Sequence, residues 1–465
     1  MGQPEHADVV VIGLGPGGEY AAGTLAEAGL RVTGIESRLV GGECPYYGCV
    51  PSKMMIRAAN LIAETRRVPG MAGTSAITPE WPTVARRIRE EATDDWNDKV
   101  AADRFTGKGG HLIRGHGRIT GPGQVTVTGP EGIQVLAAGM GIVINTGTEP
   151  AIPPLPGLEG TPYWTNREVV QAERVPESLI VLGGGAIGAE FAQVFARFGT
   201  TVTVVEALPR LVSFEEPEAS ELIERVFTAA GITVCTDAPA ERISHNGTQF
   251  SVHLGMSTLM AERLLVATGR RTDLAALGVA AVGLDPEARA IPTDGWMRAA
   301  DGVWAIGDVT GKGAFTHMSM YQAAIAVRDI LGQGGGSADY RAVPRVTFTD
   351  PEIGGVGLTE EQARAAGLRV RTGTTQVPYS ARGWIHKAGN DGFIKVVEDA
   401  DRSVLVGATS AGPAGGEVLS ALQVAIRAEV PVATLRNMPY AYPTFHRAIE
   451  DALKNLDEAE GSRSS

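Results

Sequence analysis

"ADVVVIGLGPGGEYAAGTLAEAGLRVTGIES", residues 7–37, begins with an apolar run typical of a buried strand and continues through glycines into a helix of small residues. Gly13, Gly15 and Gly18 permit a tight turn and a close approach of the backbone to a pyrophosphate, which would face the helix N-terminus. Glu36 ends the next apolar run, where an acidic side chain accepts hydrogen bonds from ribose hydroxyls. The stretch therefore predicts a βαβ unit that binds a dinucleotide.

The same pattern returns in "SLIVLGGGAIGAEFAQVFARFGTTVTVVEALPR" at residues 178–210. The turn glycines are Gly183, Gly185 and Gly188, and Glu206 ends the following strand at the spacing seen in the first copy. Two such units predict two separate dinucleotide sites. Because a carboxylate repels a 2′-phosphate, Glu206 favours NADH over NADPH.

Arg210 follows Glu206 closely and leaves two interpretations open. Its guanidinium weakens the preference for NADH, or it is a solvated surface residue, as most arginines are.

Composition excludes several classes of protein. The 465 residues are 43% apolar and 20% charged, which is typical of a globular protein of several domains. The net charge of −12 argues against a nucleic-acid or anionic-membrane partner. We find no secretory signal and no apolar run long enough to span a bilayer, and we expect a cytoplasmic protein.

Cys44 and Cys49 lie in "GGECPYYGCVPSK", residues 41–53, and are two of the chain's three cysteines. The short loop between them can close into a disulfide, and the helix predicted directly after it favours a thiolate on the second cysteine. A structural disulfide is unusual in a reducing compartment, and a metal site needs more ligands than this stretch offers. A redox pair is the favoured interpretation, with a structural bond and a metal site as alternatives.

Two dinucleotide units with a cysteine pair after the first resemble the class I pyridine nucleotide-disulfide oxidoreductases, a flavoprotein family that includes lipoamide dehydrogenase, glutathione reductase and mercuric reductase. The cysteine stretch resembles the family's GGTC-x4-C-x-P-x-K segment. Four further stretches are similar to family segments: "NTGTEP" at 145–150, "VATGR" at 266–270, "VWAIGDV" at 303–309 and "FTDPEIGGVGLTE" at 348–360.

The resemblance implies an α/β fold with two Rossmann-like dinucleotide-binding domains, for FAD and NAD, and a C-terminal α+β dimerisation domain. It places an FAD domain at 1–150, an NAD domain at 151–273, a central return at 274–342 and an interface domain at 343–465. A homodimer is implied. The glycine-rich residues 331–344 independently suggest a linker, because they show no apolar periodicity.

The resemblance also implies roles for particular residues. Cys49 would meet the flavin, Cys44 would attack the substrate, and Lys53, near the flavin, would pair with Glu190; the alternative is that Lys53 and Glu190 are ordinary solvated helix residues. His317 would line the flavin ring or sit in the core, and Cys235 would be an inert buried thiol. The remaining cofactor contacts implied are Gly42, Gly117, Gly147, Gly269 and Asp308.

The C-terminal segment "PYAYPTFHRAIEDAL", residues 439–453, departs from the family pattern. Tyr442 stands where the family's disulfide reductases have histidine, and Arg447 stands where they have the glutamate that orients it. Such a dyad moves protons on and off the thiols, which tyrosine cannot do near neutral pH. Two further interpretations stay open: His446, one helical turn on, substitutes, or Tyr442 forms an aromatic pocket with Tyr46, Tyr47 and Tyr440.

These observations predict an FAD enzyme that passes electrons from NADH through the flavin and the Cys44–Cys49 pair to an unidentified disulfide, metal ion or quinone. The alternatives are a dihydrolipoyl dehydrogenase and a metal reductase similar to mercuric reductase. The latter also carries tyrosine in place of histidine, but its C-terminal cysteine pair is absent here. A flavin-bound redox sensor is the non-enzymatic alternative. No resident metal site is expected.

Overall fold

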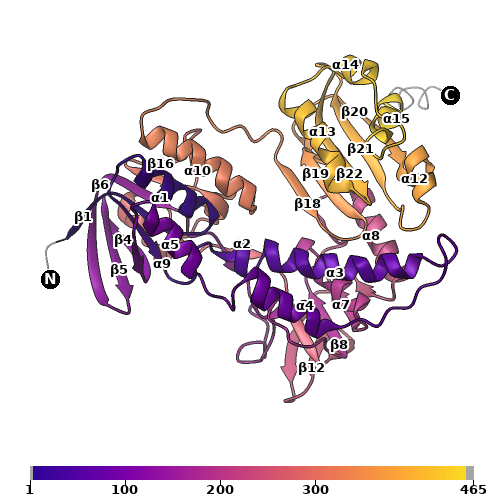
Figure 1. Ribbon diagram of the computed structural model, residues 1–465, viewed down its shortest axis with the longest axis horizontal. Coiled ribbons are helices and arrows are strands. Elements are labelled where there is room, and N and C mark those ends of the chain that lie inside the picture. The colour runs from indigo at the N-terminus through magenta and orange to yellow at the C-terminus, as the bar shows by residue number, and fades with distance from the viewer. Residues whose placement is uncertain (1–3, 457–465) are drawn as a thin grey trace. The chain divides into compact units, whose positions relative to one another are not determined.

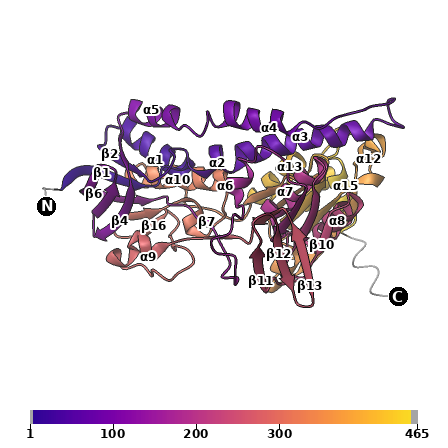
Figure 2. The same cartoon turned by 90° about the horizontal axis from the view of Figure 1, so that it is seen from below.

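The computed structural model describes residues 4–456 and divides into two compact units (Figures 1 and 2). Unit 1 comprises residues up to Ser52, 86–151 and 270–339, and unit 2 comprises 53–85, 152–269 and residues from Tyr340 onward. The predicted FAD domain and central return fall mainly in unit 1, the predicted NAD domain falls mainly in unit 2, and the predicted interface domain falls in unit 2. The three boundaries between the four predicted segments stay a prediction.

Unit 1 is built on a sheet whose central strands are parallel. β1 pairs in parallel with β2 on one side and β6 on the other, in the order β16-β17-β6-β1-β2-β3, while β4 and β5 extend from β6 as antiparallel strands. Val9, Val10 and Val11 of β1 are fully buried, as expected for a strand covered on both faces. The strands are β1 (Glu5–Ile12), β2 (Val32–Glu36), β3 (His111–Arg114), β4 (His116–Gly121), β5 (Gln124–Gly129), β6 (Gly132–Ile144), β16 (Arg298–Ala300) and β17 (Val303–Ala305).

Two long helices of unit 1 pack against each other, α1 (Pro16–Glu27) and α10 (Thr316–Ile330) (Figure 1). A separate two-stranded antiparallel pair, β7 (Glu149–Pro150) with β15 (Arg270–Arg271), joins the ends of two stretches that resemble family segments, 145–150 and 266–270. The shorter helices are α2 (Glu43–Tyr46), the π-helical turn η1 (Ile88–Ala92), α5 (Lys99–Gly107), α9 (Leu274–Leu277), and the 3₁₀ turns η2 (Val279–Val282) and η3 (Gly307–Thr310).

Two helices run across the division between the units. They are α3 (Cys49–Arg67) and α4 (Trp81–Arg87).

Unit 2 contains a second, smaller parallel sheet in the order β10-β9-β8-β14, next to an antiparallel sheet in the order β11-β12-β13. The parallel strands are β8 (Ser178–Leu182), β9 (Thr201–Val205), β10 (Thr233–Cys235) and β14 (Arg263–Val266); the antiparallel ones are β11 (Arg242–His245), β12 (Phe250–Leu254) and β13 (Ser257–Ala261). The helices of this part are α6 (Asn166–Val169), α7 (Ala186–Arg197) and α8 (Pro217–Ala229).

The C-terminal part of unit 2 is a five-stranded antiparallel sheet in the order β18-β19-β22-β21-β20. α13 packs on β19 and β22, and α15 packs on β20 and β21. The strands are β18 (Pro344–Thr347), β19 (Glu352–Gly357), β20 (Val370–Gln376), β21 (Phe393–Asp399) and β22 (Val404–Gly412). The helices are α11 (Glu360–Ala365), η4 (Val377–Tyr379), α12 (Ala381–His386), α13 (Gly415–Arg427), α14 (Val432–Asn437) and α15 (Ala448–Lys454).

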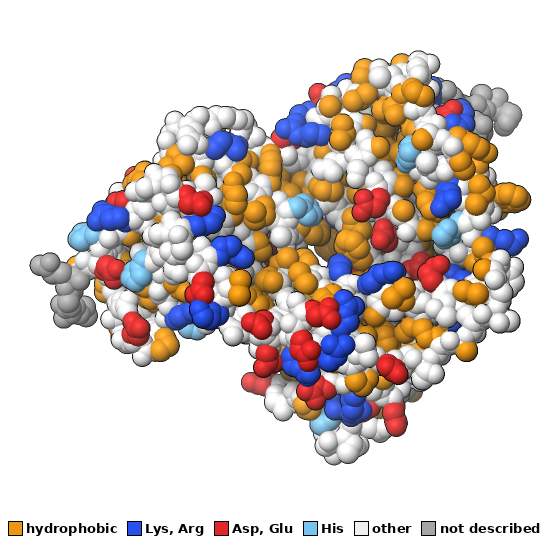
Figure 3. All heavy atoms as spheres, in the orientation of Figure 1, with side chains coloured by type: hydrophobic (Ala, Val, Ile, Leu, Met, Phe, Trp, Pro, Cys, Tyr) orange, Lys and Arg blue, Asp and Glu red, His pale blue; other side chains and the backbone are white. Residues whose placement is uncertain are grey.

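This architecture confirms the predicted fold class. Among the described residues no helix is both long and apolar enough to cross a membrane. Acidic and basic side chains are interspersed over the face shown in Figure 3.

The two glycine turns have the same packing. A Cβ added to Gly13 would lie 2.4 Å from the Asn145 carbonyl oxygen, and one added to Gly183 would lie 2.4 Å from the Ala267 carbonyl oxygen. A Cβ on Gly18 or Gly188 would come within 2.0 Å of the carbonyl oxygen of the first glycine of the same turn. Glycine is therefore required in both copies because the helix packs directly on the strand before it.

We predict that Gly188→Ala destabilises the protein by about 1–3 kcal/mol, because the new methyl group overpacks the contact between α7 and β8. Urea denaturation monitored by circular dichroism would measure the loss. The control is Gly185→Ala, where the added Cβ meets no atom within 4 Å and φ is an ordinary −72°. Equal stability of the two variants would contradict this account of the packing.

Candidate active site

Each glycine turn is closed by its own acidic residue. In unit 1 the Glu36 carboxylate accepts hydrogen bonds from Leu14 N at 2.7 Å and Arg38 N at 2.8 Å. In unit 2 the Glu206 carboxylate accepts from Gly184 N at 2.6 Å and Leu208 N at 2.8 Å, the equivalent positions. Each carboxylate oxygen has a further lone pair, and a ribose hydroxyl could donate to it.

Both turns fit the pyrophosphate of a dinucleotide. Gly15 and Gly185 precede α1 and α7, and neither helix has a side-chain cap on its first N–H groups. These N–H groups and the helix dipole suit a phosphate. Gly42 packs against the first turn, since a Cβ there would lie 2.8 Å from Gly15 Cα. Burial raises the pKa of Glu36, and its two backbone hydrogen bonds oppose this shift.

The predicted cysteine pair is brought together in unit 1. Cys44 lies in α2, and the exposed Cys49 is the first residue of α3, where the helix dipole stabilises negative charge. Both are free thiols and their side chains are hydrogen-bonded, which with burial raises the pKa of Cys44. Negative charge on Cys49 adds to this effect. Cys44 therefore keeps its proton when Cys49 is a thiolate.

Thr316 is a neighbour of these thiols that the sequence analysis missed. Its Oγ1 lies 3.5 Å from Cys49 Sγ, and its hydrogen bond lowers the pKa of Cys44. Thr316 is the first residue of α10, so that a second helix N-terminus lies beside the pair. The sequence gives no signal for this contact, because 267 residues separate Thr316 from Cys49. Only the fold brings the two residues together.

Lys53 and Glu190 form the predicted ion pair in unit 2. Lys53 Nζ lies 2.8 Å from Glu190 Oε2, and the other oxygen of the buried Glu190 accepts a hydrogen bond from Phe348 N at 2.8 Å. The ammonium group also lies 4.6 Å from the centroid of the Phe348 ring. A buried carboxylate needs such partners, and the partly exposed Lys53 side chain is consequently held at Glu190.

Comparison with known proteins agrees with this arrangement. A family model described as pyridine nucleotide-disulphide oxidoreductase matches residues 7–327, and the model of that family's dimerisation domain matches residues 343–453. The chain belongs to the pyridine nucleotide-disulphide oxidoreductase family. Members of this family are FAD-dependent and NAD(P)H-dependent oxidoreductases.

Relatives in this family align over nearly the whole chain. The dihydrolipoyl dehydrogenase of Chlorobaculum tepidum is 35% identical over 98% of both chains. The mercuric reductase of Acidithiobacillus ferrooxidans is 33% identical over 98% of this chain and 83% of its own length. Among solved structures, a Cu(II) complex of the HOCl-induced flavoprotein disulfide reductase RclA from Escherichia coli has a TM-score of 0.84 at 29% identity, covering 98% of this chain and 99% of that one.

Asp308, which the family resemblance suggests as a cofactor contact, is part of a hydrogen-bonded network in unit 1. Its Oδ2 accepts from Thr148 Oγ1 at 2.8 Å, and Arg270 Nε donates to the same hydroxyl at 2.7 Å. Arg270 also approaches Glu43, next to Cys44, at 3.7 Å. Burial raises the pKa of Asp308, while Thr148 and Arg270 oppose this shift. Thr148 and Arg270 stand in two motifs quoted for the resemblance, but neither was singled out.

The other glycines predicted to contact a cofactor differ in their surroundings. A Cβ on Gly117 would meet Ile12 and Ile35 side-chain atoms at 3.1–3.2 Å, so this position is tightly packed. Gly147 and Gly269 have φ of +64° and +114° and no atom near an added Cβ. Their backbone conformation rather than packing therefore calls for glycine.

In the C-terminal segment the side chains of Tyr442 and Arg447 lie beside each other. Tyr442 is 70% exposed, and the Arg447 guanidinium lies 5.5 Å from the centroid of its ring while pairing with Glu450 at 2.8 Å. Residues 442–447 form no helix, so the expectation that His446 follows Tyr442 by one helical turn is wrong. Tyr440 is buried and donates to the Leu435 carbonyl oxygen, so it serves packing.

Three expectations about single residues need correction. Arg210 is not a solvated surface residue, because its guanidinium donates to the carbonyl oxygens of Ser213 and Glu215 and to Ser220 Oγ. His317 is exposed and its ring stacks on Phe315, so it is not a core histidine. Cys235 is only half-buried, although burial does raise its pKa.

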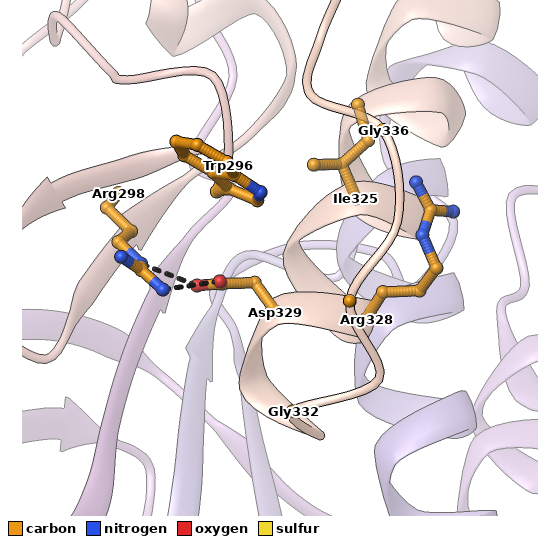
Figure 4. Close-up of a pocket in the computed structure, with 8 residues that line it drawn as sticks. Trp296, Arg298, Ile325, Arg328, Asp329, Gly332 and Gly336 are labelled. Atoms are coloured by element: carbon orange, nitrogen blue, oxygen red, sulfur yellow. Dashed lines mark hydrogen bonds and ion pairs between the residues drawn. The ribbon is translucent and has the colours of Figure 1, made fainter.

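Unit 1 also has a cavity of about 160 Å³ that contains no predicted site residue (Figure 4). Arg298 and Asp329, which line it, form an ion pair at 2.6 Å, and Trp304 Nε1 donates to the same carboxylate. The charges of this pair are therefore already compensated.

We predict that in the reduced protein at neutral pH iodoacetamide modifies Cys49 before Cys44, because only the thiolate reacts and the raised pKa keeps Cys44 protonated. Modification of Cys44 should accelerate as the pH rises from about 7 to 10. Mass spectrometry of timed samples would measure both rates. The Cys49→Ser variant lacks the negative charge beside Cys44, so the pKa of Cys44 should fall. Cys44 should then react faster in this variant than in the native protein at the same pH. Equal rates for the two thiols would contradict the prediction.

Proposed function

We propose that this enzyme oxidises NADH and passes the electrons through FAD and the Cys44–Cys49 pair to an external acceptor. The observation that carries the proposal is the pair of hydrogen-bonded thiols, of which Cys49 is exposed at the first residue of α3. FAD, when bound, supplies the two-electron relay between the nicotinamide and the cysteines. The acceptor receives its electrons when the dithiol closes to a disulfide and releases two protons.

The chain's own residues have distinct tasks in this proposal. Cys49 exchanges electrons with the flavin side, Cys44 attacks the acceptor, and Lys53, held by Glu190, provides a fixed positive charge at the flavin. Tyr442 stands at the position of the family's acid–base histidine but does not transfer protons as that histidine does. The residues proposed to hold FAD are Gly13, Gly15, Gly18, Glu36, Gly42, Lys53, Gly117, Gly147 and Asp308, and those proposed to hold NAD are Gly183, Gly185, Gly188, Glu206 and Gly269.

The proposed preference for NADH rests on Glu206. Its carboxylate is where a 2′-phosphate would lie, and repulsion favours the unphosphorylated cofactor. Arg210, the nearby cation, donates to the carbonyl oxygens of Ser213 and Glu215 and to Ser220 Oγ of α8, which supports this preference.

A thiophilic metal ion is the acceptor class that the site favours. A disulfide acceptor must gain two protons as it becomes two thiols, and the histidine–glutamate dyad that would deliver them is absent. Two Cu(II) ions, in contrast, take two electrons to become Cu(I), and the dithiol's two protons go to water. The mercuric reductase relatives and the Cu(II) complex of RclA support this class.

A homodimer in the cytoplasm is also proposed. The match to the family's dimerisation domain at residues 343–453 supports self-association. Exposed apolar side chains of that segment, Tyr379, Trp384 and Ile385, would be covered in such an assembly.

We predict that anaerobic NADH titration of the FAD-loaded protein consumes more than one equivalent and that two alkylatable thiols appear. A visible spectrum follows the flavin, and mass spectrometry after iodoacetamide treatment counts the thiols. Cys44→Ser is the matched control, because it retains the flavin but has no pair to reduce; it should consume one equivalent. If the native protein behaves like this variant, the redox-pair proposal is wrong.

We predict that Tyr442→His with Arg447→Glu raises the turnover of lipoamide at least about tenfold, because general acid–base catalysis contributes 10²–10⁴-fold when complete. Turnover of Cu(II) should stay within about twofold, since its reduction requires no delivered proton. Initial rates of NADH oxidation with each acceptor would measure both. A native enzyme already fast with lipoamide would favour the alternative function, a dihydrolipoyl dehydrogenase, and negligible turnover with all acceptors would favour a redox sensor.

A further inference from the structure

A short segment of unit 1 has a backbone that ordinary side chains avoid. The π-helical turn Ile88–Ala92 is followed by three residues with left-handed φ, namely Asp94 at 49°, Asp95 at 56° and Trp96 at 55°. Aspartate tolerates this conformation, whereas for a bulky residue such as tryptophan it is a true outlier. Strained backbone of this kind, like π-helical turns, is concentrated at functional sites.

The buried Thr93 holds this turn together. Its hydroxyl lies 3.1 Å from the Ile88 carbonyl oxygen and accepts a hydrogen bond from Trp96 N at 3.3 Å. Asp95 N donates to the Arg89 carbonyl oxygen at 2.7 Å. The left-handed conformation is therefore fixed by specific contacts.

The turn places the Trp96 indole against α2, the helical turn that contains Cys44. Trp96 Nε1 donates to the Tyr46 carbonyl oxygen at 3.1 Å, and Tyr46 is the last residue of α2, the single helical turn that contains Cys44. The last carbonyl groups of a helix have no partner within the helix, so the indole supplies one from outside.

Asp98, close to Trp96 in the chain, contacts the residues that precede Cys44. Asp98, two residues after Trp96, accepts a hydrogen bond from Val40 N at 2.6 Å and is fixed by a bidentate pair with Arg114. Residues 96–98 thus contact the chain both before and after Cys44.

We propose that Trp96 is a positioning residue that holds α2 so that Cys44 Sγ stays against Cys49 Sγ. This inference rests on the proposed function, because the position of α2 matters only if the pair closes and opens. Fixing two reacting groups near each other raises their effective concentration. Loss of the indole hydrogen bond should therefore make the disulfide easier to reduce.

The test is the equilibrium between the cysteine pair and dithiothreitol. Oxidation of the pair breaks two S–H bonds and forms one S–S bond, and the two electrons and two protons convert oxidised dithiothreitol into its dithiol. Holoprotein is equilibrated under argon at a series of reagent ratios, quenched with acid and labelled with a maleimide, and the two redox forms are counted by mass spectrometry.

We predict that Trp96→Phe lowers the equilibrium constant for disulfide formation about fivefold, the usual effect of one lost hydrogen bond. For a two-electron couple this makes the midpoint potential about 20 mV less negative. The matched control is Trp81→Phe, which removes an indole N–H hydrogen bond to the Ala172 carbonyl oxygen in unit 2. The control should have the native potential; a native potential in Trp96→Phe, or an equal shift in both variants, would overturn the inference.

A second variant covers the case in which Trp96→Phe does not fold by circular dichroism. Thr93→Val keeps the shape of the side chain but removes the hydroxyl that fixes Trp96 N, and it should shift the potential in the same direction. An unshifted potential in Thr93→Val then overturns the inference. If the native protein shows no dithiol–disulfide equilibrium at all, the proposed function fails instead, so the two failures are distinguishable.

Discussion

One buried carboxylate organises unit 2. Glu190, on α7, binds Lys53 of α3 through one oxygen and Phe348 N, which directly follows β18, through the other. Burying an ionised carboxylate is costly unless each of its oxygens has a partner. α3, α7 and the residue after β18 must therefore all pack at Glu190 in the folded protein. Nearby, Gln193 of α7 donates to the Asp350 carbonyl oxygen and accepts from Asp350 N, and Arg67 and Arg197 pair with the Asp350 carboxylate. α3 is thus fixed to the rest of unit 2 near both of its ends, through Lys53 and Arg67.

The glycine turns and the cysteine pair resemble the family's motifs more closely than residues 439–453 do. Both glycine turns, each closed by its acidic residue, and the hydrogen-bonded cysteine pair are present in the described residues. The C-terminal segment matches the model of the family's dimerisation domain, and there the exposed Tyr442 lies beside Arg447.

Local patterns were predictable from the sequence because their physical cause is local. Gly13, Gly18, Gly183 and Gly188 are required by the turn in which they lie, and Cys49 begins the helix that its sequence predicts. The Lys53–Glu190 pair, 137 residues apart, could be inferred only through the family resemblance. Thr316 and Trp96 could not be inferred, because their partners lie in distant segments and no spacing rule connects them. The expected position of His446, one helical turn after Tyr442, is wrong because residues 442–447 form no helix.

The double use of Glu206 has a consequence for redesign of coenzyme choice. Its carboxylate is at once the candidate ribose acceptor and the group that receives Gly184 N and Leu208 N. Replacing it with a neutral or basic side chain to admit a phosphorylated cofactor would leave two backbone N–H groups without their acceptor and loosen the turn itself. A successful exchange of coenzyme would therefore need a compensating acceptor in the same loop, so that specificity and loop integrity have to be altered as one unit.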